Sequence, residues 1–151
     1  MWSVCAPNDA LRGSDVDKQL ISSKLESLRL ALARVRQRTP ANAAALAADV
    51  DAQDIVSLNL QRAVQLCVDI AYHLSAAADA AEPETMAGAF TALFDAGLID
   101  AALSESLRRA VGFRNIAVHQ YERMDWQIVF DVATKRIVDL EAFARAVAAR
   151  L

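Results

Sequence analysis

The residues best suited to chemistry lie close together near position 115. They are Arg114, Asn115, His119 and Tyr121. Imidazole titrates near neutrality and can move protons at pH 7, while arginine stays charged and presents a fork of donors that suits phosphate. These two side-chain types are the minimum set for cleaving RNA without a metal ion. His119 would help a 2′-hydroxyl attack the neighbouring phosphorus, and Arg114 would stabilise the phosphorane, which leaves a 2′,3′-cyclic phosphate and a 5′-hydroxyl.

The spacing of these residues limits what a single helix can do. On an ideal helix Asn115 and His119 are four apart and share a face, as do Arg114 and Tyr121 at seven apart. Arg114 and His119 are five apart and diverge by about 140°. Either the helix loosens near His119, or two chains pair so that one supplies the arginine and the other the histidine. We favour the second arrangement, because a symmetric dimer places both motifs around its two-fold axis.

A structural interpretation competes with catalysis. Arginine, asparagine and histidine near a helix end also satisfy backbone carbonyls and bind neighbouring helices. Tyr121 would then be an amphipathic ring that closes the helix end. The other histidine, His73, follows Tyr72 on a predicted helix, and we interpret it as structural or as a surface residue. Spacing alone leaves both interpretations open.

Helices must position this cluster. The chain has 151 residues, of which 55% are hydrophobic and 23% charged, so it can form one domain with a proper core. Its four glycines and three prolines are too few for the many turns of a β-sandwich or barrel. We therefore expect an all-α, single-domain antiparallel bundle of about five helices over residues 15–151, preceded by an irregular leader over residues 1–14.

Apolar spacing and terminal residues predict where the five helices lie. The first covers about 15–38, and its apolar seam is Ile21, Leu25, Leu28, Leu32 and Val35. The second runs from about 41 or 51 to 78 and is apolar around most of its girth, with a polar stripe that starts at Asp54, so it should be central. The third opens at Glu82-Pro83-Glu84 and ends at Gly97, Asp100 caps the fourth, and the fifth covers about 125–151.

Charge is distributed unevenly although the net charge is only −3. Residues 15–38 sum to +3, residues 39–100 to −8 and residues 101–151 to +2. A domain that binds nucleic acid over its whole surface would be basic throughout. The acidic middle instead suits a basic partner surface, or confines RNA to a local cleft.

Neither the cysteines nor the apolar runs indicate a special compartment. Two cysteines make no disulfide framework and no metal motif. No apolar run approaches the roughly 18 residues of a membrane span, and the first residues lack the pattern of a secretory signal. We expect a cytoplasmic protein that uses neither a metal ion nor a cofactor and does not bind membranes.

The string Arg114-Asn115-x-x-x-His119-x-Tyr121, preceded by Gly112-Phe113, resembles the signature of HepT-type proteins of the HEPN superfamily. Residues 54–74 are similar to the second helix of that family and residues 90–99 to its third. The resemblance covers roughly residues 15–145. It therefore extends over most of the chain, with the motif in the expected helix order.

The resemblance implies a toxin of a type VII-like toxin–antitoxin pair. Such toxins are metal-independent endoribonucleases that act on cellular RNA, either mRNA or tRNA, as homodimers with a composite cleft. It implies that Arg114 and His119 are catalytic and that Asn115 supports the cleft. Tyr121 matches the position to which a partner antitoxin, a minimal nucleotidyltransferase, adds AMP from ATP. That addition would place a bulky anion at the cleft and block RNA.

Two other functions remain open from the sequence. One is a HEPN module that binds a nucleotide or RNA without cleaving it. The other is a purely structural dimerisation bundle, in which replacing His119 would change neither toxicity nor RNA.

Overall fold

Helices account for nearly all of the regular structure. The computed structural model describes residues 6–78 and 82–151, with side chains from residue 17 onward, and contains no strand in those ranges. The all-α expectation is confirmed. In chain order the elements are α1 (Ala6–Arg38), α2 (Ala43–Ala47), α3 (Val50–Ala77), α4 (Met86–Asp95), α5 (Ala101–His119), the 3₁₀ turn η1 (Tyr121–Arg123), α6 (Trp126–Asp131), the π-helical turn η2 (Val132–Arg136) and α7 (Ile137–Ala148).

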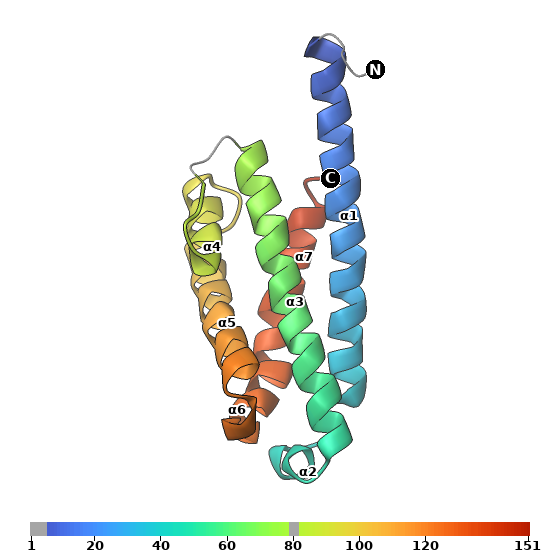
Figure 1. The fold of residues 1–151 in the computed structure, drawn as a ribbon, viewed down its shortest axis with the longest axis vertical. Helices are drawn as coiled ribbons and strands as arrows, with labels where there is room; N and C mark the ends of the chain where they lie inside the picture. Colours follow the sequence, from blue (N-terminus) through green and yellow to red (C-terminus); the bar gives the residue numbers. More distant parts are fainter. Residues whose placement is uncertain (1–5, 79–81) are drawn as a thin grey trace.

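The long helices run up and down the bundle, with α3 at its centre (Figure 1). Helix α3 contacts α1, α2, α4, α5 and α7. This confirms the central position predicted from the apolar residues around most of its circumference. Helix α2 packs against α6. The end of α5, α6, α2 and the start of α3 therefore gather at one end of the bundle (Figure 1). This is the end at which the chemically interesting residues lie.

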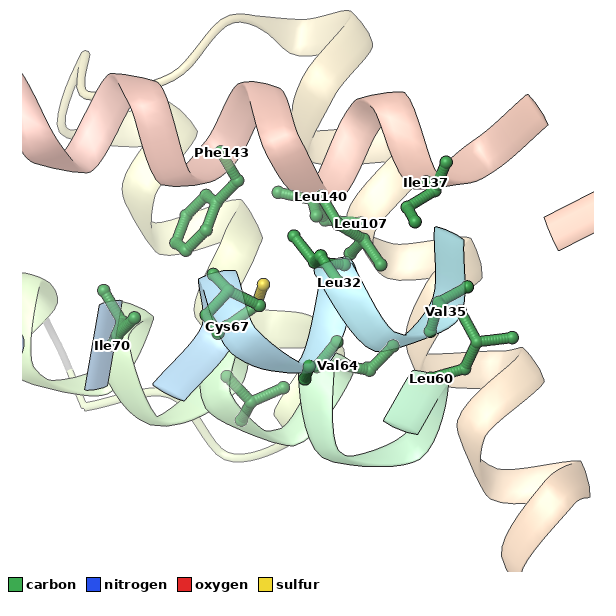
Figure 2. Close-up of a cluster of buried hydrophobic side chains, with 14 of the residues drawn as sticks. Leu32, Val35, Leu60, Val64, Cys67, Ile70, Leu107, Ile137, Leu140 and Phe143 are labelled. Carbon is green, nitrogen blue, oxygen red and sulfur yellow. The ribbon is translucent and has the colours of Figure 1, made fainter. Parts of the chain in front are cut away.

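One apolar core joins the long helices. All five residues of the seam predicted for α1 are buried. Side chains from α1, α3, α5 and α7 meet in the middle of the bundle (Figure 2). Among them are Leu32, Val35, Leu60, Val64, Cys67, Ile70, Leu107, Ile137, Leu140 and Phe143. Phe90 from α4 adds an edge-to-face contact with Phe143, at 5.8 Å between ring centroids.

The first helix begins earlier than the sequence analysis predicted. Its backbone is helical from Ala6, so the irregular leader expected over residues 1–14 is wrong for residues 6–14, while residues 1–5 lie outside the described part. Pro7 is compatible with this start because the first turn needs no amide donor there. Gly13 costs a helix only about 1 kcal/mol relative to alanine, which is too little to end it.

The other helix ends agree with the predictions except at the start of α4 and in the C-terminal helix. Thr85, not the segment around Pro83, caps α4, because the Thr85 side chain accepts from the Gly88 amide at 2.9 Å. Gly97 ends the α4 turn with a φ of 75°, a conformation that favours glycine. Asp125 caps α6. The single fifth helix expected from there is divided by the π-helical turn η2 and ends at Ala148.

Over the described ranges, no helix is both long and apolar enough to cross a bilayer.

Candidate active site

Helix α5 carries the first three candidate residues. Asp100 starts it by accepting from the Leu103 amide at 2.8 Å, as predicted. Its buried face, which includes Leu107 and Val111, packs into the core. The helix stops after His119 because Gln120 leaves the helical region at φ −134° and ψ 38°, while the Gln120 amide still donates to the Ile116 carbonyl at 2.8 Å.

Arg114 and Asn115 are brought together by a direct hydrogen bond. Arg114 Nη1 donates to Asn115 Oδ1 at 3.2 Å, and both side chains are partly buried. Arg114 Nε is fully buried and has no hydrogen-bond partner among the described residues. Arginine carries five N–H donors, so the guanidinium keeps donors for an anionic acceptor beyond the one that Asn115 uses. Asn115 restrains the guanidinium while leaving donors free.

His119 is exposed and is the last residue of α5. The helix is α-helical from Arg114 to His119, so it does not loosen near His119, and that alternative is wrong. The five-residue spacing therefore keeps its divergence of about 140° along one helix. Ile116 and Val118, between the two, are 52% and 42% exposed. No side-chain hydrogen bond in the described part of the chain joins Arg114 to His119.

Tyr121 lies beyond the helix and faces another element. It begins η1, so it does not share a helical face with Arg114, and this prediction is wrong. Its hydroxyl donates to Asp54 Oδ1 of α3 at 2.6 Å, and its ring meets Trp126 edge-to-face at 5.9 Å between centroids. Burial, followed by the hydrogen bond to Asp54 and the negative charge of that carboxylate, raises the pKa of Tyr121 to about 12.

The backbone after α5 explains how Tyr121 reaches α3. The Arg123 amide donates to the Gln120 carbonyl at 2.9 Å, and the Met124 amide donates to the Tyr121 carbonyl at 3.2 Å. These bonds close the 3₁₀ turn and return the chain toward the bundle. Residues 118–123 line an open hollow on the surface that includes His119 and Tyr121.

Asp54 belongs to this site but could not be recognised from the sequence. In the sequence Asp54 stands at the start of the polar stripe of α3 and within the acidic segment, 67 positions from Tyr121. The one available signal was an acidic residue at the first position of that stripe. Nothing in the spacing links it to Tyr121, because the contact depends on how α3 and the end of α5 pack.

Two other residues singled out in the sequence, Cys67 and His73, lie on α3. Cys67 is fully buried in the core, as predicted, and burial raises the pKa of its thiol, which makes it an inert apolar residue. His73 is half-buried on α3. Across residues 17–78 and 82–151, no three His, Cys, Asp or Glu side chains form a group that could hold a metal ion.

Comparisons with known proteins agree with this geometry. The family described as ribonuclease HepT-like matches residues 28–147. The mRNA nuclease HepT of Shewanella oneidensis is 34% identical over 124 residues, which cover 82% of this chain and 92% of the relative.

Single chains in solved structures of toxin–antitoxin complexes have the same fold as this chain. One complex, with AMP-PNP, contains a chain that matches with a TM-score of 0.81 and 32% identity, covering 87% of this chain and 98% of that one. The tri-AMPylated HEPN toxin of Shewanella oneidensis, in complex with its MNT antitoxin, matches with a TM-score of 0.79 and 33% identity, covering 85% and 96%. The chain thus has the fold of HEPN toxins and belongs to the HepT-like ribonuclease family.

Proposed function

We propose that this HepT-like protein is the toxin of a type VII-like toxin–antitoxin pair and cleaves cellular RNA as a metal-independent endoribonuclease. The observation that carries the proposal is the partly buried Arg114 guanidinium, which Asn115 holds through one nitrogen, on the same helix as the exposed His119. An arginine with an unsatisfied donor favours an anionic ligand, and a histidine open to solvent can meet a hydroxyl of that ligand.

In the proposed reaction His119 takes the proton of a ribose 2′-hydroxyl. The 2′-oxygen forms a bond to the adjacent phosphorus, the bond from phosphorus to the 5′-oxygen breaks, and that oxygen leaves as a 5′-hydroxyl once protonated. Arg114 stabilises the charge on the phosphorane, and Asn115 holds the guanidinium in place. The products are a 2′,3′-cyclic phosphate and a 5′-hydroxyl.

We propose a homodimer as the active form. The divergence of about 140° between Arg114 and His119 along a regular helix favours a cleft in which each chain supplies one of them. The exposed Ile116 and Val118 lie between these residues and would be covered by a second copy. A cleft built this way places RNA at the two-fold axis, where both copies contribute side chains.

We further propose that a minimal nucleotidyltransferase antitoxin, acting in the cytoplasm, silences the toxin by adding AMP to Tyr121. Tyr121 lies two residues after His119 and lines the same hollow. A nucleotide on its hydroxyl would bring a bulky anion to the mouth of the cleft and repel the RNA backbone. The tri-AMPylated HEPN toxin of Shewanella oneidensis, solved in complex with its MNT antitoxin, supports AMP addition to the toxin.

Incubation of the purified protein with total RNA and tRNA in EDTA tests the ribonuclease proposal. A measurement of the intact mass is made first, to establish that the sample carries no AMP. We expect cleavage that persists in EDTA, disappears in His119→Ala and is retained in the matched control His73→Ala, which removes the other histidine. The absence of cleavage by an unmodified dimer would contradict the proposal and favour a HEPN module that binds RNA or nucleotide, or a dimerisation bundle.

A further inference from the structure

The hydrogen bond between Tyr121 and Asp54 joins the proposed modification site to the first turns of α3. The phenolic oxygen lies 2.6 Å from Asp54 Oδ1. The Tyr121 ring also packs edge-to-face against Trp126 at the start of α6. The hydrogen bond and this ring contact together fix the position of the phenol, although Asp54 itself is exposed to solvent.

The chemistry of a tyrosine acceptor gives this contact a role. A neutral phenol is a weak nucleophile and needs an adjacent base or a lowered pKa. Here burial and Asp54 raise the pKa of Tyr121 to about 12, so the phenolate is not formed in advance at neutral pH. The proton must leave as the new bond forms, and a base for that step has to lie within about 2.6–3.2 Å of the oxygen. Asp54 meets that condition.

We propose that Asp54 takes part directly in nucleotide transfer to Tyr121: it holds the phenolic oxygen and accepts its proton as that oxygen attacks a nucleoside triphosphate. This inference rests on the proposed function, in which Tyr121 is the acceptor. The phenolic oxygen forms a bond to the α-phosphorus, and the bond from that phosphorus to the bridging oxygen of pyrophosphate breaks. Pyrophosphate leaves with the electron pair, and the proton passes to the Asp54 carboxylate and then to water.

The product cannot keep the original contact. The ester oxygen of a modified Tyr121 has no hydrogen to donate, and the attached phosphate is an anion beside the Asp54 carboxylate. Like charges at this distance repel, so the modified side chain moves away from α3. Asp54 thus favours the unmodified state of the acceptor and disfavours the product at the same position, which directs the nucleotide outward from the bundle.

Steady-state kinetics of AMP incorporation from ATP by the nucleotidyltransferase partner test this role. Asp54→Asn keeps an oxygen that accepts the hydrogen bond but loses the proton acceptor, so we expect kcat to fall by about 100-fold or more. Asp51→Asn, which removes the same charge from the first turn of α3, is the matched control and should leave kcat unchanged. The KM for the toxin should change no more in Asp54→Asn than in Asp51→Asn, because both variants remove one exposed charge from the same acidic segment.

A conservative variant separates proton transfer from hydrogen bonding. Asp54→Glu keeps the carboxylate on a longer side chain, and we expect it to be modified at least about tenfold faster than Asp54→Asn. Equal rates for these two variants would overturn the role of the carboxylate. So would modification of Asp54→Asn at the wild-type kcat, or a change confined to KM.

The outcomes also distinguish this inference from the proposal on which it rests. If the wild-type chain gains no AMP, or if Tyr121→Phe gains as much as the wild type, the acceptor assignment fails and the inference fails with it. If the wild type is modified on Tyr121 and Asp54→Asn is modified equally fast, only the role of Asp54 is wrong.

Discussion

Replacing Tyr121 by phenylalanine removes one oxygen and should separate stability from regulation. The hydrogen bond of Tyr121 to Asp54 has a charged acceptor, and such bonds contribute about 1.5–3 kcal/mol when both groups are shielded. Asp54 is exposed and regains water when its partner is removed. The phenylalanine ring keeps the edge-to-face contact with Trp126. We therefore expect a loss of about 1 kcal/mol in the free energy of unfolding.

Urea unfolding followed by far-ultraviolet circular dichroism, at equal protein concentration, measures this loss. For a chain of this size it corresponds to a decrease of about 2–4 °C in the melting temperature. Tyr72→Phe is the matched control, because the Tyr72 hydroxyl makes no hydrogen bond to any side chain or backbone atom in the described residues. It should change stability by less than about 0.5 kcal/mol.

The same variant should keep full ribonuclease activity and accept no AMP. A loss of more than about 3 kcal/mol would refute the reasoning, since it would make Tyr121 a structural anchor comparable to a buried core residue. No loss at all would refute it as well, because the contact with Asp54 would then contribute nothing in solution.

Five further outcomes follow from the structure. Because the fold raises the pKa of Tyr121 to about 12 from about 10 in an unfolded chain, the stability that this phenol adds is complete below pH 10 or so and is lost as the pH rises to about 12. Asp54→Asn should lower that pKa, as measured by tyrosinate absorbance. Asp100→Ala should cost about 1 kcal/mol in thermal unfolding by removing the cap of α5. Phe90→Ala should lower the free energy of unfolding by about 3–5 kcal/mol in the same measurement, because it leaves a cavity in the core. Arg114→Lys should fold normally yet lower the RNA cleavage rate by about 100-fold, because lysine lacks the planar fork of donors.

Local features of the sequence were sufficient for the helices and for most of their ends. The seam from Ile21 to Val35 was buried as predicted because residues three and four apart lie on one face of any α-helix. Asp100 was recognisable as a cap because its carboxylate needs only the amide three residues later. The start of α1 was missed since a single proline or glycine in a favourable stretch does not end a helix.

The residues of the candidate site also fall into two groups, those placed by local sequence and those placed by the packing of helices. Arg114, Asn115 and His119 occupy one helix, so the sequence by itself determined their order, their spacing and the angle between them. Tyr121 differs because Gln120 turns the chain out of the helix, and only the packing of α3 beside the end of α5 decided where its hydroxyl lies. The partnership with Asp54 spans 67 positions, and no periodic rule reaches across that distance. Helical geometry is set by neighbours three and four residues away, whereas contacts between helices depend on how whole apolar faces fit together.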